Sequence, residues 1–296
     1  MDIETYHEVV AEVVRGDIRM ISGCQDAQTS GDEGAEIGGI CTSSMTACWA
    51  SGEVDTWATM LSMMYNMIRA RDEAQTPLLS ASRMYDLQEP FSFVNPSSNG
   101  RTRALIIGVN YVGTDDELGG CHTDAQNMME FIAELGYSMN EEDCMVLMDD
   151  GEHESPGLEN ILNGISWLVS EATEGDSLFF FFAGHGNNQA DDTGEEGDGM
   201  DETICPVDCD TAGHLTDDDI LKHLVLPIPE GVTLTAVVDA CHSGSVFDLP
   251  FTCDITEETL ASLEAGEMFL KPNDSFHPEV ARQFREELEQ VVEEEE

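Results

Sequence analysis

The chain has 296 residues, 41% of them hydrophobic, which suffices for one large α/β domain or two small ones with an ordinary globular core. Its 61 acidic and 11 basic residues give a formal net charge of −50, which repels phosphate backbones and excludes nucleic acid as a partner, while cations and basic peptides are attracted. No run approaches the roughly 20 apolar residues of a membrane span, and the acidic start MDIETYHEVV has no signal-peptide pattern, so we expect a cytoplasmic protein that does not bind membranes.

The first hundred residues alternate between helical and extended patterns. Apolar periodicity predicts helices near 4–14, 41–51 and 54–71, and strands at 17–22 and, in PLLSAS, at 77–82. A Gly-rich loop is expected at 31–39. The segment VNPSSNGR (94–101) has the composition of a boundary, so we divide the chain into a first half, residues 1–95, and a second half, residues 96–253.

The second half has the alternating order of βαβ units. Buried-strand patterns predict strands at 103–110, 144–148, 177–184 and 233–240, and amphipathic patterns predict helices at 122–136, 158–173 and 216–225. This order indicates an α/β fold with a mostly parallel central sheet flanked by helices. In such sheets, ligand sites gather at the carboxyl ends of the strands.

Residues 254–296 form an acidic C-terminal extension. Residues 279–293 have the composition of a charged helix that runs into EEEE. From the sequence we prefer the alternative, a solvated and frayed tail, because termini rich in like charges are poorly ordered.

The nine cysteines are odd in number and lack the regular spacing of a disulfide framework. This indicates reduced thiols in an intracellular compartment. Cys205 and Cys209 are the closest pair, but no second pair with nearby histidines completes a zinc site, so we predict none. Two other cysteines stand where a strand-end nucleophile would: Cys24 in ISGCQDAQTS and Cys241 in AVVDACHSGS.

A histidine distinguishes these two cysteines. FFFFAGHGN places His185 directly after a buried strand, between two glycines that let the backbone turn sharply. If its strand neighbours the one that leads to Cys241, the imidazole can form the thiolate, and the N–H groups of Gly186 and Cys241 can bind an oxyanion. No side chain clearly orients His185, although a backbone carbonyl could. For Cys24, the sequence shows no comparable buried strand that leads directly to a partner histidine.

At this point the sequence resembles the caspase and hemoglobinase clan of cysteine peptidases, and within it the metacaspases. The resemblance rests on GCHTDA (120–125), FFAGHG, PVDCD (206–210), LTDDDI (215–220) and TAVVDACHSGSVFDLPF (235–251), which look like the large, catalytic half of a metacaspase. ISGCQDAQTS and TPLLSASRMYDLQEPFSF (76–93) look like the small half, which here comes first. That order is similar to the type III metacaspases of algae, and it implies a caspase-like fold in which both halves form one domain.

The resemblance assigns roles to individual residues. His185 and Cys241 match the catalytic dyad. Cys121, Asp124 and Asp239 match positions that line the pocket for the residue before the scissile bond. Acidic groups in that pocket select arginine or lysine by charge pairing.

Three further positions would line the substrate groove. Ala183 stands where many family members have a serine, so one pocket hydrogen bond is expected to be missing. Ser80 and Ser82 would lie on the substrate-facing side of the groove.

The resemblance also implies a calcium site made by Asp201, Asp217, Asp218 and Asp248. Ca²⁺ is a hard cation that takes six to eight oxygen ligands. From the residues alone, TDDD (216–219) is the N-cap and acidic first turn of the helix at 216–225. The acidic stretch DDTGEEGDGMDE (191–202) lacks EF-hand spacing and is expected to be a loop that concentrates the ion.

The implied activity is a calcium-dependent cysteine endopeptidase, expected to be a monomer, that cleaves protein and peptide substrates after Arg or Lys. Arg101 and Arg103 at the join are the obvious self-cleavage candidates, yet the short join leads us to expect activity without cleavage between the halves. Two alternatives remain. One is a non-catalytic, calcium-responsive scaffold on a caspase fold, and the other is a peptide ligase that uses the same dyad.

Overall fold

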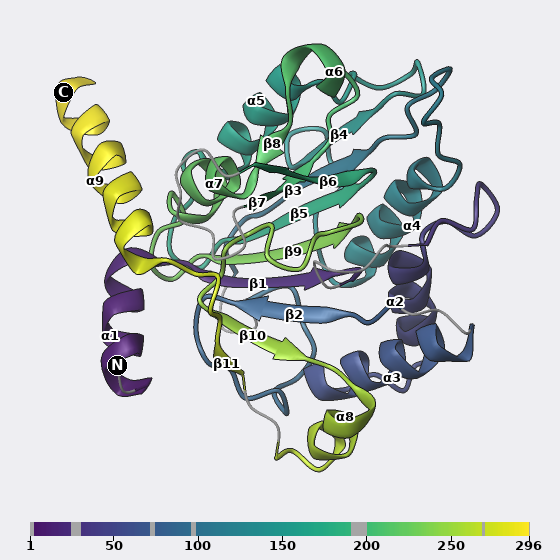
Figure 1. The fold of residues 1–296 in the computed structure, drawn as a ribbon, viewed down its shortest axis with the longest axis horizontal. Helices are drawn as coiled ribbons and strands as arrows, with labels where there is room; N and C mark the ends of the chain where they lie inside the picture. Colours follow the sequence, from purple (N-terminus) through teal and green to yellow (C-terminus); the bar gives the residue numbers. More distant parts are fainter. Residues whose placement is uncertain are drawn as a thin grey trace.

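The computed structural model describes residues 3–24, 31–71, 75–95, 99–190, 200–267 and 270–295 (Figure 1). Most of the acidic stretch predicted to be a loop at 191–202, namely residues 191–199, therefore lies outside the described residues. The predicted boundary at 94–101 is described only at its two ends. Within the described ranges, no helix combines the length and the apolar composition needed to cross a membrane.

One eight-stranded sheet forms the centre of the molecule, in the order β11-β10-β2-β1-β9-β5-β3-β4 (Figure 1). Its strands are β1 (Asp17–Ser22), β2 (Leu78–Ala81), β3 (Thr102–Gly108), β4 (Cys144–Met148), β5 (Ser177–Ala183), β9 (Thr233–Asp239), β10 (Phe251–Asp254) and β11 (Lys271–Pro272). The five strands from β1 to β4 in this order are parallel, and β2, β10 and β11 add an antiparallel edge. The predicted α/β fold with a mostly parallel sheet is confirmed.

The two strands of the first half, β1 and β2, lie between strands of the second half in this sheet. β1 comes from the first half and pairs with β9 of the second, with Ser22 opposite Val238. β2 of the first half pairs with β10 of the second, with Leu79 opposite Cys253. The two halves therefore share one sheet and one hydrophobic core.

Both faces of the sheet are covered by helices, which explains why all seven residues of β5 and of β9 are buried. On β3, Gly108 approaches Ala125 of α4 (Cys121–Glu134), whereas Leu105 meets Gly164 of α5 (Leu158–Val169). Because side chains alternate along a strand, α4 and α5 lie on opposite faces. Two helices of the first half, α2 (Ile40–Ala50) and α3 (Trp57–Ala70), pack on the α4 side (Figure 1).

A small second sheet was not predicted. It contains β6 (Gly186–Ala190), β7 (Met200–Ile204) and β8 (Leu215–Thr216), with the short helix α6 (Cys209–Ala212) between β7 and β8. The helix predicted at 216–225 is two elements: α7 (Asp217–Ile220) continues as a π-helical turn, Leu221–Val225.

The described part of the C-terminal extension is largely helical, so the preferred prediction of a frayed tail is wrong. It forms α8 (Glu257–Glu264) and α9 (Pro278–Glu295), and α9 packs beside α1 (Ile3–Val13) (Figure 1). The Arg285 guanidinium donates to the carbonyls of Val13 at 2.6 Å and Leu226 at 2.8 Å, and Ala281 is fully buried. These contacts join α9 to both halves of the chain.

Candidate active site

The two predicted catalytic residues follow neighbouring strands. β5 and β9 are parallel, and their register sets Ala183 opposite Asp239. His185 and Cys241 each stand two residues beyond that pair, so the register brings both to the same edge of the sheet. A Cβ built on Gly186 would lie 1.8 Å from the Cys241 carbonyl oxygen, so only glycine allows this close approach.

The imidazole of His185 is oriented by the chain that follows β3. Its Nε2 lies 2.8 Å from the carbonyl oxygen of Asp116. Because a carbonyl can only accept, Nε2 carries the ring proton and Nδ1 keeps its lone pair. Nδ1 is therefore the atom that can take a proton from a thiol. The expectation that a backbone carbonyl could orient His185 matches this geometry.

Tyr111 supports the same histidine and was not predicted. Its hydroxyl accepts the N–H of His185 at 2.8 Å, and the two rings pack with centroids 4.6 Å apart. Tyr111 adopts a left-handed backbone conformation with φ of 53°, which is uncommon for a bulky residue. The sequence offered no signal for this contact, since Tyr111 lies 74 positions from His185.

Cys24 lies beside the turn that carries Cys241, but its environment is different. The Cys24 side chain is fully buried, and its thiol donates to the carbonyl of Ala240 at 3.2 Å. Burial is the main cause that raises the pKa of Cys24 to about 11, so its thiol is protonated at neutral pH. Cys241 is partly exposed. Accessibility beside His185 therefore favours Cys241 as the nucleophile.

The chain turns sharply after β9, at Cys241 and the two residues that follow it. His242 has a left-handed φ of 52°, and the Ser243 hydroxyl donates to the Ala240 carbonyl at 2.8 Å. The Cys241 carbonyl lies against Gly186 here, and the role of the two N–H groups as oxyanion donors stays a prediction.

Two buried carboxylates lie next to the dyad. Asp239 ends β9, two residues before Cys241, and Asp124 lies in the first turn of α4. The Gly39 N–H donates to both oxygens of Asp124 at 2.9 and 2.8 Å, and the N–H and hydroxyl of Thr42 donate to Asp239 at 2.9 and 2.8 Å. Burial first, and the charge of Asp239 second, raise the pKa of Asp124 to about 8. These hydrogen bonds hold both carboxylates in place close to Cys241.

The predicted Gly-rich loop forms one wall over this acidic pair. A Cβ on Gly39 would lie 2.4 Å from Asp239 and 3.1 Å from Asp124, so this backbone passes against both carboxylates. Asp32 anchors the loop to the second half by accepting the Gly119 N–H at 2.9 Å. The two acids were predicted as pocket residues from the sequence, but the contact of the glycines with them was not. A run of glycines is itself a signal for close backbone approach.

The other two predicted pocket positions border the same acids. Cys121 is buried at the start of α4, where its N–H donates to the Asn110 side chain at 3.0 Å. Burial, followed by the charge of Asp124, raises the pKa of the Cys121 thiol well above its usual value. Ala183 is buried opposite Asp239, and its methyl group offers no hydrogen bond.

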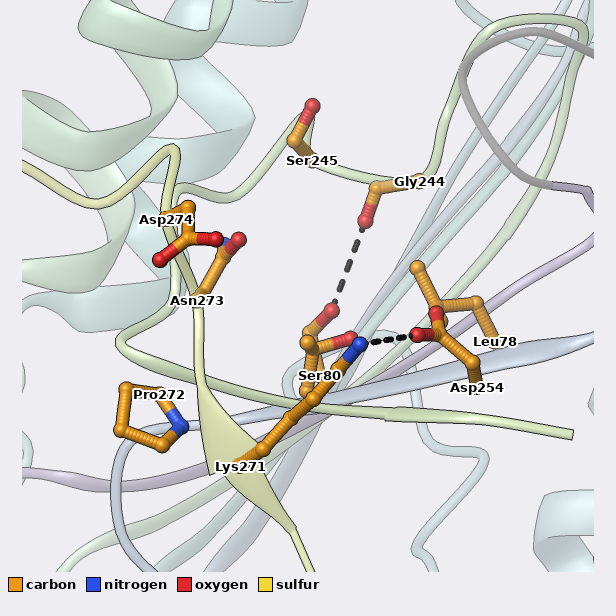
Figure 2. Close-up of a pocket in the computed structure, with 10 residues that line it drawn as sticks. Leu78, Ser80, Gly244, Ser245, Asp254, Lys271, Pro272, Asn273 and Asp274 are labelled. Atoms are coloured by element: carbon orange, nitrogen blue, oxygen red, sulfur yellow. Dashed lines mark hydrogen bonds and ion pairs between the residues drawn. The ribbon is translucent and has the colours of Figure 1, made fainter. Parts of the chain in front are cut away.

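The two predicted serines lie two residues apart on and just after β2, and Ser82 is farther from the catalytic edge. Ser80 lines a cavity of about 370 Å³, where its hydroxyl lies 3.4 Å from the carbonyl of Gly244, close to the turn that carries Cys241 (Figure 2). The Ser82 hydroxyl instead accepts the Ile18 N–H and donates to the Gly16 carbonyl, both at 2.9 Å. β2 runs antiparallel to β1, so each step along it leads away from the catalytic edge. The prediction that Ser82 faces the groove is therefore wrong.

Three of the four predicted calcium ligands converge. One carboxylate oxygen from each of Asp217, Asp218 and Asp248 lies within 4.8 Å of the other two. Burial, followed by the charges of Asp201 and Glu202, raises the pKa of Asp217 to about 8. Asp201 is close enough to act on Asp217 but is outside the three-residue group. Clustered, partly buried carboxylate oxygens are the donor set that Ca²⁺ prefers, so these residues fit the ion.

The interpretation of TDDD as a helix start is confirmed. The Thr216 hydroxyl accepts the Asp219 N–H at 3.1 Å and caps α7. The carboxylate of Asp217 accepts the N–H groups of Glu202 and Asp218, both at 2.8 Å. The acids at this helix start can therefore serve as helix N-terminal residues and as cation ligands together.

A partly exposed cysteine beside a histidine whose Nδ1 keeps its lone pair, at the carboxyl edge of a parallel sheet, defines a cysteine-dependent hydrolase. The family model described as metacaspase, peptidase C14 domain, matches residues 102–250. The chain belongs to this family and is a cysteine endopeptidase.

Individual relatives agree with this assignment. Metacaspase III c of Phaeodactylum tricornutum (strain CCAP 1055/1) is 38% identical over 266 residues, which cover 84% of this chain and 79% of that protein. Metacaspase-1A of Neurospora crassa is 44% identical over 187 residues, covering 62% of this chain and 41% of its own. Metacaspase-2 of Arabidopsis thaliana is 47% identical over 161 residues, which cover 53% of this chain and 38% of that protein. The chain thus spans about four fifths of the diatom protein but only about two fifths of the other two.

The match to the diatom protein includes part of the first half, because 266 residues exceed the stretch from 96 to 296. This agrees with the predicted resemblance to type III metacaspases.

Proposed function

We propose that the chain is a calcium-dependent endopeptidase that cleaves after Arg or Lys. The observation that supports this specificity is the buried pair of Asp124 and Asp239 beside Cys241, whose donors at Gly39 and Thr42 are neutral. A guanidinium can bridge two carboxylates through its fixed fork of N–H donors, and an ammonium can balance the same charge. An aspartate before the scissile bond would be repelled.

The geometry supports a two-step acyl transfer. The sulfur of Cys241 attacks the carbonyl carbon while its proton passes to Nδ1 of His185, and the Asp116 carbonyl stabilises the imidazolium that forms. The N–H groups of Gly186 and Cys241 donate to the oxyanion. His185 then gives its proton to the leaving amine as the C–N bond breaks. Water hydrolyses the thioester and restores the thiol.

Two alternatives remain distinguishable from hydrolysis after Arg or Lys. A non-catalytic scaffold is disfavoured because both members of the dyad are present. A peptide ligase would use the same acyl-enzyme, with an amine in place of water. Mass spectrometry of the products in the presence of an added amine separates ligation from hydrolysis.

The carboxylates of Asp217, Asp218 and Asp248 support the calcium requirement. Asp248 follows Cys241 on the same turn, and this turn is linked to β7 because the Ser245 hydroxyl donates to Glu202 at 2.8 Å. A cation held by these acids would supply positive charge that fixes the turn.

A calcium titration with fluorogenic peptides tests substrate and cofactor together. We expect calcium to activate cleavage of Arg and Lys peptides, with a preference of about 100-fold or more over an Asp peptide, since a buried like charge costs several kcal/mol. Asp218→Asn removes one charged ligand and is expected to raise the calcium needed for half-activation about tenfold.

Asp219→Asn is the matched control, because Asp219 neighbours Asp218 but is outside the three-residue group. It is expected to leave the calcium requirement near that of the parent. A clear preference for Asp peptides would contradict the pocket assignment, and full activity in a calcium chelator would contradict the cofactor assignment.

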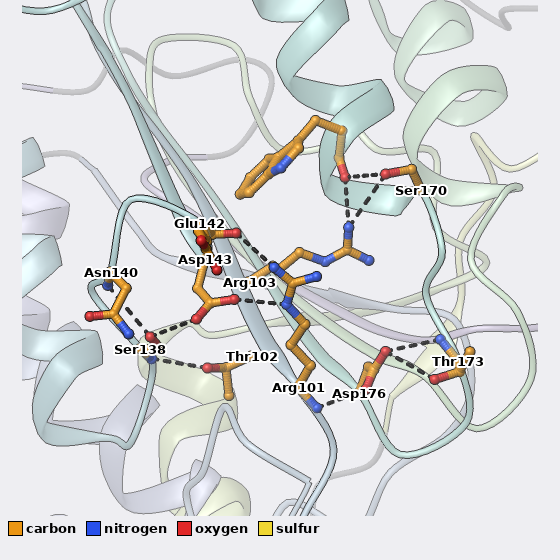
Figure 3. A network of polar contacts seen from close by, with 11 residues as sticks. Arg101, Thr102, Arg103, Ser138, Asn140, Glu142, Asp143, Ser170, Thr173 and Asp176 are labelled. Carbon is orange, nitrogen blue, oxygen red and sulfur yellow. Dashed lines mark hydrogen bonds and ion pairs between the residues drawn. The ribbon is translucent and has the colours of Figure 1, made fainter.

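Arg101 and Arg103 are unsuited to self-cleavage at the join (Figure 3). The Arg101 side chain donates to Asp143 at 2.7 Å, and its N–H donates to Asp176 at 2.8 Å. Arg103 is buried, and its guanidinium donates to the Trp167 carbonyl at 2.8 Å. Both lie at the start of β3, the end of the sheet opposite the dyad.

Arg101→Gln is therefore expected to stay fully active with calcium and to run as an intact chain on a denaturing gel, as the parent does before turnover. The lost ion pair is exposed, so folding is expected to change little. Loss of activity in Arg101→Gln with an unchanged Tm would mean that cleavage between the halves is required.

A further inference from the structure

A group of soft metal ligands lies beside the dyad and has no role in the mechanism above. Cys205 follows β7, Cys209 begins α6 and His214 precedes β8. The two sulfur atoms and one ring nitrogen of His214 lie within 4.8 Å of one another. Tetrahedral zinc, with Zn–S of about 2.3 Å and Zn–N of about 2.0 Å, needs ligand atoms about 3.5–3.8 Å apart, so a small closure completes the geometry.

The backbone that carries these ligands is held in place by its own hydrogen bonds. The Cys209 N–H donates to Pro206 at 3.1 Å, and the Gly213 N–H donates to Cys209 at 3.0 Å. Gly213 has a left-handed φ of 92°, which reverses the chain and returns His214 toward the two cysteines. The sequence spacing suggested a cysteine pair without a partner, whereas this turn supplies a third ligand.

Hydrogen bonds fix the tautomer of His214. The Thr203 hydroxyl has one proton, which it donates to the Asn187 carbonyl at 3.0 Å. The 2.9 Å contact between this hydroxyl and Nδ1 of His214 therefore uses the proton on Nδ1. Nε2 keeps its lone pair and is available to a metal, with the supporting hydrogen bond on the other nitrogen that metal-binding histidines commonly have.

The three ligands open on the cavity that contains the catalytic histidine. This cavity, of about 300 Å³, is lined by Cys205, Cys209 and His214 and also by His185 and Asp116. Cys205 is buried and the other two ligands are half-buried. Three protein ligands leave one coordination position open, which is typical of an exchangeable site rather than a closed structural one.

Cys205 is joined to His185 by two hydrogen-bonded routes, one through the backbone and one through the Tyr111 hydroxyl. The Cys205 N–H donates to the His185 carbonyl at 3.0 Å. The Cys205 carbonyl accepts the Tyr111 hydroxyl proton at 2.6 Å, and the same hydroxyl accepts the His185 N–H at 2.8 Å. A cation that draws the Cys205 sulfur inward therefore acts on the residues that position His185.

We propose that Cys205, Cys209 and His214 bind a thiolate-preferring divalent cation of the zinc type, and that its binding inhibits the peptidase by altering the surroundings of His185. The site is distinct from the acidic calcium group, which offers only oxygen ligands. On binding, each thiol releases its proton to solvent and its sulfur bonds to the metal. The inhibitory part rests on the proposed role of His185, whereas the binding part does not.

Binding is tested with Co²⁺ and Zn²⁺ on the full chain carrying Cys241→Ala, under a phosphine reductant, so that the nucleophile cannot compete as a ligand. We expect one equivalent of Co²⁺ to give a thiolate-to-cobalt charge-transfer absorption that Zn²⁺ displaces. Adding Cys209→Ser or His214→Ala is expected to weaken Zn²⁺ binding by at least about 100-fold, two pKd units.

Cys144→Ser in the same background is the matched control, since Cys144 is a half-buried thiol on β4 outside this cavity. It is expected to leave the cobalt spectrum and Zn²⁺ affinity unchanged. A cobalt spectrum that persists unaltered in both Cys209→Ser and His214→Ala, or that never forms, overturns the site and leaves the peptidase assignment intact.

Inhibition is tested with Zn²⁺ and an Arg peptide in the chain that retains Cys241, in saturating calcium. The Zn²⁺ concentration for half-inhibition is expected to rise at least about tenfold in Cys209→Ser and His214→Ala, each compared with its own metal-free rate. Equal inhibition of all variants would mean that zinc acts at the dyad itself, which overturns the regulatory part of the proposal. An inactive parent would instead contradict the proposed function.

Discussion

Cys241→Ser is expected to lower kcat for an Arg peptide by at least about 10³-fold, whereas Cys24→Ser should retain most of the parent activity. A hydroxyl is a far weaker nucleophile than a thiolate formed beside His185. At Cys24 the same substitution keeps a group that can donate to the Ala240 carbonyl, as the thiol does at 3.2 Å. Initial rates at saturating calcium, with circular dichroism to verify folding, provide the measurement.

Labelling with iodoacetamide separates the two cysteines by a second route. The partly exposed Cys241 should react first, and the fully buried Cys24, whose pKa is raised to about 11, should react only after unfolding. Peptide mapping by mass spectrometry identifies the labelled residue. If Cys24→Ser folds normally and loses as much activity as Cys241→Ser, the assignment of Cys241 as the single nucleophile fails.

The dyad was predictable from the sequence because its signals are local. A buried apolar run marks each strand, and His185 and Cys241 follow those runs directly. Parallel strands end at one edge of a sheet, so two strand-end residues can be expected to meet. Asp116 was not predictable, because it acts through a main-chain carbonyl that every residue has.

Predictions that required knowledge of topology were less successful. Period-2 alternation sets Ser80 and Ser82 on the same face of a strand, but only the antiparallel pairing of β2 shows that Ser82 lies at the far end. The order of α9 likewise depends on Arg285, which contacts Val13 from 272 positions away. Local composition gives no information about such distant partners. The acidic composition of the tail therefore favoured the prediction of disorder.

At pH values above about 8, where Asp124 is ionised, Asp124→Asn is expected to lower kcat/KM for Arg and Lys peptides about 100-fold, because it removes a buried charge while retaining an acceptor for the Gly39 N–H. In the parent, kcat/KM should rise as pH increases through about 8, because Asp124 loses its proton over this range. The variant should lack this rise. Because Cys241 and His185 also titrate in both proteins, the ratio of the two pH profiles is the quantity to measure, and a ratio independent of pH contradicts the pocket assignment.

The same substitution has a distinct effect on stability, whose sign follows from the direction of the pKa shift. Burial raises the pKa of Asp124 from 3.8 to about 8 on folding, so its contribution to stability is complete below pH 3.8 and is lost as pH rises through 8. Asparagine is neutral throughout and escapes this loss. Between about pH 5 and pH 9, the Tm of Asp124→Asn should therefore rise relative to the parent.

Asp143→Asn is the matched control for this measurement. Asp143 is a half-buried acid whose pKa is lowered by its hydrogen bond from Arg101, so it is charged across the whole pH range of the experiment. Its substitution should shift Tm by a constant amount between about pH 5 and pH 9. If Asp124→Asn gives the same constant shift, Asp124 is already ionised at neutral pH, and a bound cation must then balance the acidic pair in the resting protein.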